Sequence, residues 1–250
     1  MKICSKFLFS LALLLGGLGF PGLANAEPTA AANAAFDKGI TAFGAGNVTD
    51  AVDAWTSAAA GGHPMASYLL GQLYEQGRGV EKSPTLAFQY YERAAEEGQA
   101  LAAVKVGRIY REGSEDLDIG KDYEKALASF EIAALQSWPE AQYYLADMYR
   151  HGQGVAVDRT ESLRWLILAS KKKYAPAMLE LSRVYFEGEG VLEDRLKGWT
   201  YIELASRYAT PEQGKDVNNA RDKYSKRVKN SQKEEAKTLA DKWIVDYLAN

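Results

Sequence analysis

Apolar and small residues recur along this chain in a helical pattern that itself repeats. Each copy has the form A-x-x-x-[LV]-[GAS]-x-x-Y-x-x-G, in which the apolar and small positions return every three or four residues. This spacing predicts a helix with one buried face. The copies begin at Ala66, Ala102, Ala141 and Ala177, so they are 36, 39 and 36 residues apart. A period of this length is typical of solenoids built from helical hairpins.

A second helix is predicted after each copy of this segment. Its start is marked by a short polar residue, whose side chain accepts a hydrogen bond from a free backbone N–H group of the first turn. The first helix of each pair is expected to end at a glycine such as Gly77, because glycine takes the left-handed conformation at the least cost. The expected N-caps of the second helices are Asn47, Ser83, Asp122, Asp158 and Asp194.

These elements divide the chain into five parts. Residues 1–26 are expected to be a signal peptide and residues 27–32 a flexible tail. Residues 33–64 form a first hairpin with a shorter turn, and residues 65–209 form four longer hairpins. Residues 210–250 form two C-terminal helices, which we expect to cover the hydrophobic face that the last hairpin leaves open.

The second long hairpin differs from the others by three additional residues. Its turn, at residues 113–120, is acidic and bounded by glycines. Insertions in solenoids lie in loops on one face and can belong to a binding surface. Tolerated loop growth, which costs little free energy, explains the same observation.

The first 26 residues have the pattern of a secretory leader. Lys2 and Lys6 precede an apolar run at residues 7–20, and the tripeptide at residues 24–26 fits a cleavage site, with cleavage after Ala26. We therefore expect the protein in the periplasm, with secretion as the alternative. The only cysteine, Cys4, lies in this leader. The mature chain can thus form neither disulfides nor thiolate metal sites, and no later segment has the length and apolarity of a transmembrane helix.

The charge of the chain argues against nucleic acid as a partner. The formal net charge is −3, with 30 Lys and Arg against 33 Asp and Glu. A basic run near the C-terminus is typical of a solvated helix face, and a contact with an anionic surface is the alternative. It contains Arg221, Lys223, Lys226, Arg227 and Lys229.

Residues that could perform catalysis or bind a metal are few. The two histidines, His63 and His151, are far apart in the sequence, whereas a zinc site needs three or four converging ligands. No nucleophile motif of the G-x-S-x-G type is present. We therefore expect no catalytic residues, no metal and no cofactor.

The turns after three of the first helices have the form G-x-G-V, at residues 77–80, 152–155 and 188–191. Together with the period, these turns resemble those of the Sel1-like repeat family, while the shorter first hairpin resembles a tetratricopeptide repeat. The resemblance covers residues 33–209. It implies an all-α fold, namely a right-handed α-solenoid of Sel1/TPR-like hairpins with a C-terminal helical cap. It also implies that the first helix of each hairpin lines the inner surface.

The positions of the first helices that the core does not use would then face a ligand in a groove. We hypothesise that this groove binds a peptide or domain with acidic and apolar features, because four arginines gather there and Arg and Tyr are enriched at interface hot spots. The alternative is that these are ordinary exposed helix residues. The candidate groove residues are Tyr68, Gln72, Glu75, Arg108, Arg111, Tyr143, Asp147, Arg150, His151, Arg183 and Phe186.

The overall layout resembles that of periplasmic exopolysaccharide regulators of the ExoR type. The resemblance implies a non-enzymatic negative regulator, whose partner is the sensor domain of a membrane kinase. Other Sel1-like proteins scaffold envelope polysaccharide export or motility assemblies, which is the alternative. A cell-wall enzyme built on a helical array is a further alternative, although the sequence shows no polar cluster for it. The oligomeric state is not indicated by the sequence.

Overall fold

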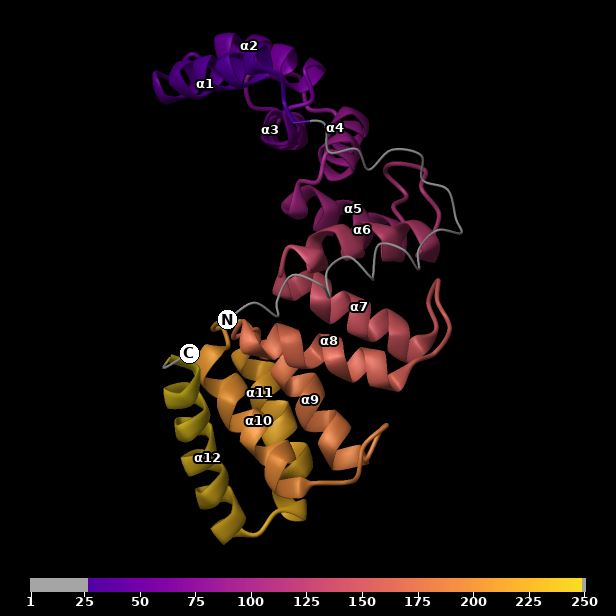
Figure 1. The fold of residues 1–250 in the computed structure, drawn as a ribbon, viewed down its shortest axis with the longest axis vertical. Helices are drawn as coiled ribbons and strands as arrows, with labels where there is room; N and C mark the ends of the chain where they lie inside the picture. The colour runs from indigo at the N-terminus through magenta and orange to yellow at the C-terminus, as the bar shows by residue number, and fades with distance from the viewer. Residues whose placement is uncertain (1–26, 249–250) are drawn as a thin grey trace, which may run out of the picture.

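The computed structural model describes residues 27–248, so the expected signal peptide lies outside the described residues. Ten helices form five hairpins that follow one another along a curved array (Figure 1). The isolated bridge between Ser114 and Ile119 is the only β pairing in residues 27–248. The expected all-α solenoid of helical hairpins is thus confirmed. The hairpins are α1 (Ala30–Gly44) with α2 (Val48–Ala60), α3 (Pro64–Gln76) with α4 (Pro84–Glu96), α5 (Ala100–Glu112) with α6 (Tyr123–Leu135), α7 (Pro139–His151) with α8 (Arg159–Lys171), and α9 (Ala175–Glu187) with α10 (Arg195–Tyr208).

Glycines of the first helices let the second helices approach closely, as at Gly39, Gly71 and Gly107. A β-carbon at Gly71 of α3 would lie 2.6 Å from Cε1 of Tyr91 in α4. At Gly107 of α5 the corresponding distance to Phe130 of α6 is 2.8 Å. Both distances are shorter than a normal carbon–carbon contact. The aromatic ring of the second helix therefore occupies the space that a side chain would need.

All five expected N-cap residues directly precede their helices, and four of them make the capping hydrogen bond. Ser83 Oγ, for example, accepts a hydrogen bond from the N–H of Leu86 at 3.3 Å. Asn47 occupies the predicted N-cap position of α2, but its side chain makes no hydrogen bond to the helix. The backbone N–H of Asn47 bonds to the carbonyl of Ala42 at 2.9 Å, and its ψ of 74° lies below that of the other caps. The shorter turn thus holds Asn47 outside the extended conformation that capping requires. The other confirmed caps are Asp122, Asp158 and Asp194.

The two glycines of each G-x-G-V turn have different roles. Gly77, Gly152 and Gly188 end their helices in the left-handed conformation, with φ values of 68°, 69° and 68°. The second glycine also contacts the preceding hairpin. A β-carbon at Gly154 would lie 2.5 Å from the carbonyl oxygen of Tyr123. The turn therefore joins one hairpin to the one before it.

The insertion in the second long hairpin is an ordered turn. Ser114 and Ile119 exchange two backbone hydrogen bonds, of 2.8 and 2.9 Å. Leu117 and Ile119 pack against the core formed by α4, α5, α6 and their neighbours. The acidic residues between Ser114 and Ile119 therefore lie in a tight turn that backbone hydrogen bonds close.

The N-terminal helix begins earlier than expected. Thr29 caps α1, since its Oγ1 accepts a hydrogen bond from the N–H of Ala32 at 3.1 Å. Ala32 is buried, and a β-carbon at Gly61 would lie 2.6 Å from it. The prediction of a flexible tail through residue 32 is therefore wrong for residues 30–32. Their packing against the end of α2 stabilises them as helix.

The C-terminal helices cover the end of the array (Figure 1). α11 (Gly214–Tyr224) continues into a short 3-10 helix, η1 (Ser225–Arg227), and α12 (Asn230–Leu248) runs along α10. Val217, Tyr224, Ala236 and Ala240 are buried in a cluster with residues of α9 and α10. These helices thus act as the expected cap on the hydrophobic face of the last hairpin.

Candidate protein-interaction surface

The candidate groove residues lie on the first helices α3, α5, α7 and α9. These helices belong to consecutive hairpins of the array (Figure 1). Most of the charged candidates are joined by ion pairs from one first helix to the next. We call the surface formed by these residues the first-helix face.

Two arginines of the first-helix face, Arg111 and Arg150, hold neighbouring hairpins together. Arg111 of α5 pairs with Asp147 of α7, and Arg150 of α7 pairs with Glu180 of α9. Arg150 Nε also lies 3.2 Å from Glu189 Oε2, in the turn after α9. Arg183 pairs with Glu180 and Glu189 in the same cluster. These arginines are mostly covered, so they act within the fold and are poorly placed to attract an acidic ligand.

The charges in this cluster stabilise one another. Burial by itself raises the pKa of Glu189, but the hydrogen bond and charge of Arg183 and the charge of Arg150 outweigh it and lower that pKa. The same bonds to Glu180 and Glu189 raise the pKa of Arg183 against the effect of its burial. Positive and negative groups are therefore balanced at the joint between the last two hairpins.

Arg108, Glu75 and His151 are the more accessible charged or titratable candidates. The Arg108 side chain is 50% exposed and reaches only Glu140, at 3.9 Å. Glu75 pairs with Lys105 of α5 at 2.8 Å and accepts a hydrogen bond from the Tyr91 hydroxyl at 2.6 Å. Burial alone would raise the pKa of Glu75, but these bonds outweigh it and lower that pKa. Arg108 is thus the arginine of this face with the weakest ion pair.

Two aromatic candidates are buried. Phe186 has no exposed surface, and its ring stacks on that of Tyr224 in the C-terminal cap. The prediction that Phe186 faces a ligand is wrong, because α11 covers the end of α9. Tyr68 is also buried, and its hydroxyl accepts a hydrogen bond from Gln72 Nε2 at 3.1 Å. Gln72 remains half-buried at the surface.

Tyr143, Asp147 and Arg150 line a small cavity between α7, α8 and α9. Its volume is about 10 Å³, roughly the space of one water molecule. Burial, followed by the charges of Glu180 and Asp147, raises the pKa of Tyr143, which keeps this hydroxyl protonated. Asp147 is further held by His151, whose Nδ1 lies 3.0 Å from Asp147 Oδ1. The centre of the first-helix face is therefore polar and closely packed.

The basic run near the C-terminus is largely used inside the protein. Arg221 pairs with Glu203 of α10 at 3.3 Å, and Lys223 lies 3.7 Å from Glu187 of α9. Arg227 reaches Glu187 at 3.4 Å and Glu193 at 3.2 Å. These cations attach the cap to the last hairpin. This arrangement weakens both the solvated-face interpretation and the anionic-surface interpretation for these three residues.

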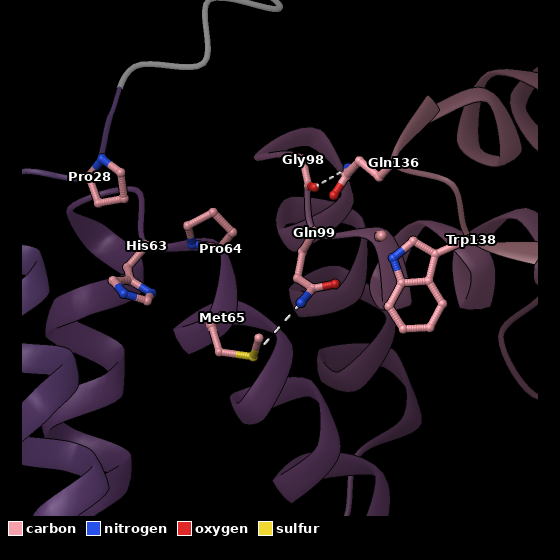
Figure 2. Close-up of a pocket in the computed structure, with 9 residues that line it drawn as sticks. Pro28, His63, Pro64, Met65, Gly98, Gln99, Gln136 and Trp138 are labelled. Atoms are coloured by element: carbon pink, nitrogen blue, oxygen red, sulfur yellow. Dashed lines mark hydrogen bonds between the residues drawn. The ribbon is translucent and has the colours of Figure 1, made fainter. Parts of the chain in front are cut away.

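A row of planar side chains was missed by the reasoning from sequence. A residue with a planar side chain directly precedes each of four first helices: His63 precedes α3, Gln99 precedes α5, Trp138 precedes α7 and Tyr174 precedes α9. They are spaced along the chain as the leading alanines are, each three residues earlier, so the repeat alignment could have revealed them. The first three line an open depression with a volume of about 460 Å³ (Figure 2).

The described part of the chain contains neither a metal-binding cluster nor a membrane-spanning helix. Residues 27–248 hold no cluster of three His, Cys, Asp or Glu side chains that could bind a metal ion. Within the same residues, no helix combines the length and apolarity needed to cross a membrane.

The four long hairpins match the family model of the Sel1 repeat. The matched residues are 64–99, 100–137, 139–174 and 175–207, which together make up more than half of the chain. The chain belongs to the Sel1 repeat family. The resemblance stated from the G-x-G-V turns is thus confirmed, and it extends over the hairpins from α3 to α10.

Two curated relatives of this Sel1 repeat protein have names connected with polysaccharides. It is 30% identical over 149 residues to an exopolysaccharide production negative regulator of Rhizobium meliloti (strain 1021). The aligned residues make up 55% of this chain and 56% of the relative. It is 34% identical over 118 residues to the alginate biosynthesis protein AlgK of Azotobacter vinelandii, covering 46% and 24%. The chain thus spans about half the length of the first relative and about a quarter of the second.

A solved structure supports the same fold. The crystal structure of c5321, a protective antigen of uropathogenic Escherichia coli strains displaying an SLR fold, superposes with a TM-score of 0.69. The sequence identity is 28%, and the superposition covers 86% of this chain and 46% of c5321. The Sel1 repeat protein therefore shares the hairpin solenoid of that antigen.

Proposed function

We propose that this Sel1 repeat protein is a non-enzymatic module that binds a protein of the cell envelope and regulates exopolysaccharide production. The observation that carries the proposal is the set of ion pairs between consecutive first helices, such as Arg111 with Asp147 and Arg150 with Glu180. They hold residues from separate hairpins in one fixed surface. A preformed surface loses little conformational entropy when a partner binds.

The biological process is inferred from the relatives. The similarity to an exopolysaccharide production negative regulator supports a role in restraining polysaccharide synthesis. We infer that the protein works in the periplasm, to which the leader at residues 1–26 would export it. The partner we propose is the periplasmic domain of a membrane sensor. A scaffold in polysaccharide export is the second candidate, and the similarity to AlgK favours it.

Arg108 is the residue of the first-helix face best suited to a test. It is half exposed and has one weak ion pair, so Arg108→Glu should leave the fold intact. Arg164 of α8 provides a matched control: it is 56% exposed and has one ion pair, to Glu161 at 3.2 Å within the same helix. Arg150 would be a poor choice, because its reversal would disturb the joint between two hairpins.

The experiment combines a genetic and a biochemical readout. In the source organism, deletion of the gene should raise the amount of exopolysaccharide, and wild-type protein or Arg164→Glu should restore it. Arg108→Glu should restore it poorly. Crosslinking in envelope extract, followed by mass spectrometry, should recover a membrane sensor with the wild-type protein and with Arg164→Glu. Arg108→Glu should recover much less of it.

Each outcome decides between the candidates. Unchanged exopolysaccharide in the deletion strain would contradict the regulatory role. Recovery of an export component in place of a sensor would favour the scaffold. Equal recovery by Arg108→Glu and Arg164→Glu would show that the first-helix face is not the binding surface. Hydrolysis of peptidoglycan or polysaccharide by the purified protein would contradict a non-enzymatic role.

A further inference from the structure

The open depression at the start of α3, α5 and α7 has the size of a ligand site. Its volume of about 460 Å³ falls within the range of small-molecule sites, roughly 300–1,000 Å³. Trp138, Gln99 and Met65 lie side by side in it, with Gln136 above Gln99 (Figure 2). Arg108, which tests the proposed function, does not line it. The lining residues are Pro28, His63, Pro64, Met65, Gly98, Gln99, Ala100, Gln136 and Trp138.

All nine lining residues are uncharged when His63 is neutral. Burial lowers the pKa of His63, which favours the neutral imidazole. The His63 Nδ1 accepts a hydrogen bond from the N–H of Ala66 at 3.3 Å, so the proton of the neutral ring lies on Nε2. A charged ligand would lose hydration here without gaining an opposite charge. The depression therefore favours a neutral ligand.

Trp138 provides a partly exposed aromatic surface. The residue is 37% exposed, and its side chain makes no hydrogen bond that caps α7. An indole ring offers a flat apolar face with one N–H donor at its edge. A ligand with a flat apolar side would cover this face and remove it from water.

Two amide side chains beside the indole have hydrogen-bonding capacity to spare. Gln99 Oε1 accepts from the N–H of Leu101 at 2.6 Å, but its Nε2 reaches only the sulfur of Met65, a weak acceptor, at 3.8 Å. Gln136 donates from Nε2 to the carbonyls of Gly98 and Ile132, at 2.7 and 3.2 Å. Its Oε1 accepts no hydrogen bond from the described protein. A donor and an acceptor are thus available at the depression.

From this arrangement we infer that the depression binds a neutral oligosaccharide. A pyranose ring has an apolar C–H face and an edge of hydroxyl groups, each of which donates and accepts hydrogen bonds. The C–H face would lie on the Trp138 indole. The hydroxyl groups would accept from Gln99 Nε2 and donate to Gln136 Oε1. This site would add a sugar ligand to the protein partner proposed above, and it does not depend on that partner.

The test uses the mature protein and a panel of hexasaccharides. Binding is measured by calorimetry and by tryptophan fluorescence with cellohexaose, laminarihexaose and chitohexaose, and with an acidic mannuronate hexasaccharide. Trp138→Ala removes the aromatic face, while Trp138→Phe keeps a smaller one. Leu135→Ala is the matched control, because Leu135 is 71% exposed nearby and does not line the depression. Circular dichroism checks that each variant is folded.

We expect at least one neutral hexasaccharide to bind. Trp138→Ala should weaken its affinity by about tenfold or more, Trp138→Phe by less, and Leu135→Ala should not change it. Absence of binding by all three neutral hexasaccharides would overturn the inference. Unchanged affinity in folded Trp138→Ala, or equal binding of the acidic hexasaccharide, would do the same. Loss of a protein partner from Trp138→Ala without any sugar binding would assign the depression to that partner instead.

Discussion

The rings of Phe186 and Tyr224 stack with their centroids 4.1 Å apart and their planes within 3° of parallel. Phe186 is the penultimate residue of α9, the first helix of the last repeat, and Tyr224 is the last residue of α11, the first helix of the C-terminal cap. The Tyr224 hydroxyl also donates a hydrogen bond to Glu187 at 3.0 Å. This contact joins the Sel1 repeats to the cap and keeps the end of α9 away from solvent.

Tyr224→Ala should therefore destabilise the protein strongly. Loss of a buried aromatic side chain costs about 3–5 kcal/mol in the free energy of unfolding. Tyr224→Phe is the control, because it keeps the stacked ring and loses only the hydroxyl bond to Glu187, worth about 1 kcal/mol. Urea denaturation followed by circular dichroism measures both. A similar loss in the two variants would mean that the ring stacking contributes little.

Gly71→Leu should overpack the hairpin of α3 and α4. A side chain at this position meets the Tyr91 ring, so the free energy of unfolding should fall by about 1–3 kcal/mol. Gly44→Ala is a suitable control, since a β-carbon at Gly44 has no atom within 4 Å. Thermal melting compares the two. An unchanged melting temperature for Gly71→Leu would contradict the close approach of the helices.

Ser137 tests the left-handed turns that lead into the first helices. Its φ is 64°, in a position where the preceding repeats have Gly62 and Gly98 with φ of 80° and 88°. Ser137→Gly should leave stability unchanged or raise it by up to about 1 kcal/mol, because the strain of a side chain there is released. Ser137→Val should lower it by about 1 kcal/mol or more, since β-branched residues resist this conformation. Chemical denaturation of the pair checks the sign.

Arg150→Glu and Arg108→Glu should separate folding from binding. Arg150 is mostly covered and faces Glu180 and Glu189, so a carboxylate there should cost about 3 kcal/mol of stability. Arg108→Glu should change stability by less than about 1 kcal/mol, because its single pair with Glu140 is exposed and long. Melting temperatures of the two variants decide the point. Equal stability would mean that the cluster around Arg150 does not hold the hairpins together.

Glu189 should make the stability of the last two repeats depend on pH. Its pKa in the folded protein lies below the usual 4.5. The carboxylate therefore stabilises the fold at neutral pH, and this contribution is lost as the pH falls through that lowered pKa. Glu189→Gln should be less stable at pH 7 and lose less stability between about pH 5 and pH 3. Melting temperatures across this range test it, and parallel curves for wild type and variant would refute it.

The starts and ends of the helices could be predicted from sequence signals that lie within a few residues of each other. Ser83, Asp122, Asp158 and Asp194 mark the starts of second helices because a cap depends only on the first turn that it bonds to. Gly77 marks an end for a similarly local reason, its left-handed conformation. Asn47 precedes α2 as predicted but makes no capping hydrogen bond, because a shorter turn, formed by residues outside the cap, changed its backbone.

The candidate surface could be predicted only as a set of positions. Helical periodicity separates the residues that pack in the core of their own hairpin from those that point away from it. Arg108, Gln72 and His151 belong to the second group and remain at least partly exposed. Periodicity does not say what the next hairpin places opposite them. Arg111 and Arg150 are at equally favourable positions, yet each pairs with an acid on the following first helix.

By itself, the sequence determined the family, the helices and most of their caps, because these depend on short-range periodicity and on backbone preferences. Only the tertiary structure decided which exposed positions remain open to a partner. Phe186 is covered by Tyr224, 38 positions later in the sequence, and Arg150 is neutralised by Glu180 of the next repeat. Trp138, in a turn, instead borders an open depression with Gln99 and Gln136. Such contacts join residues far apart in the chain, so the packing of whole hairpins decides them.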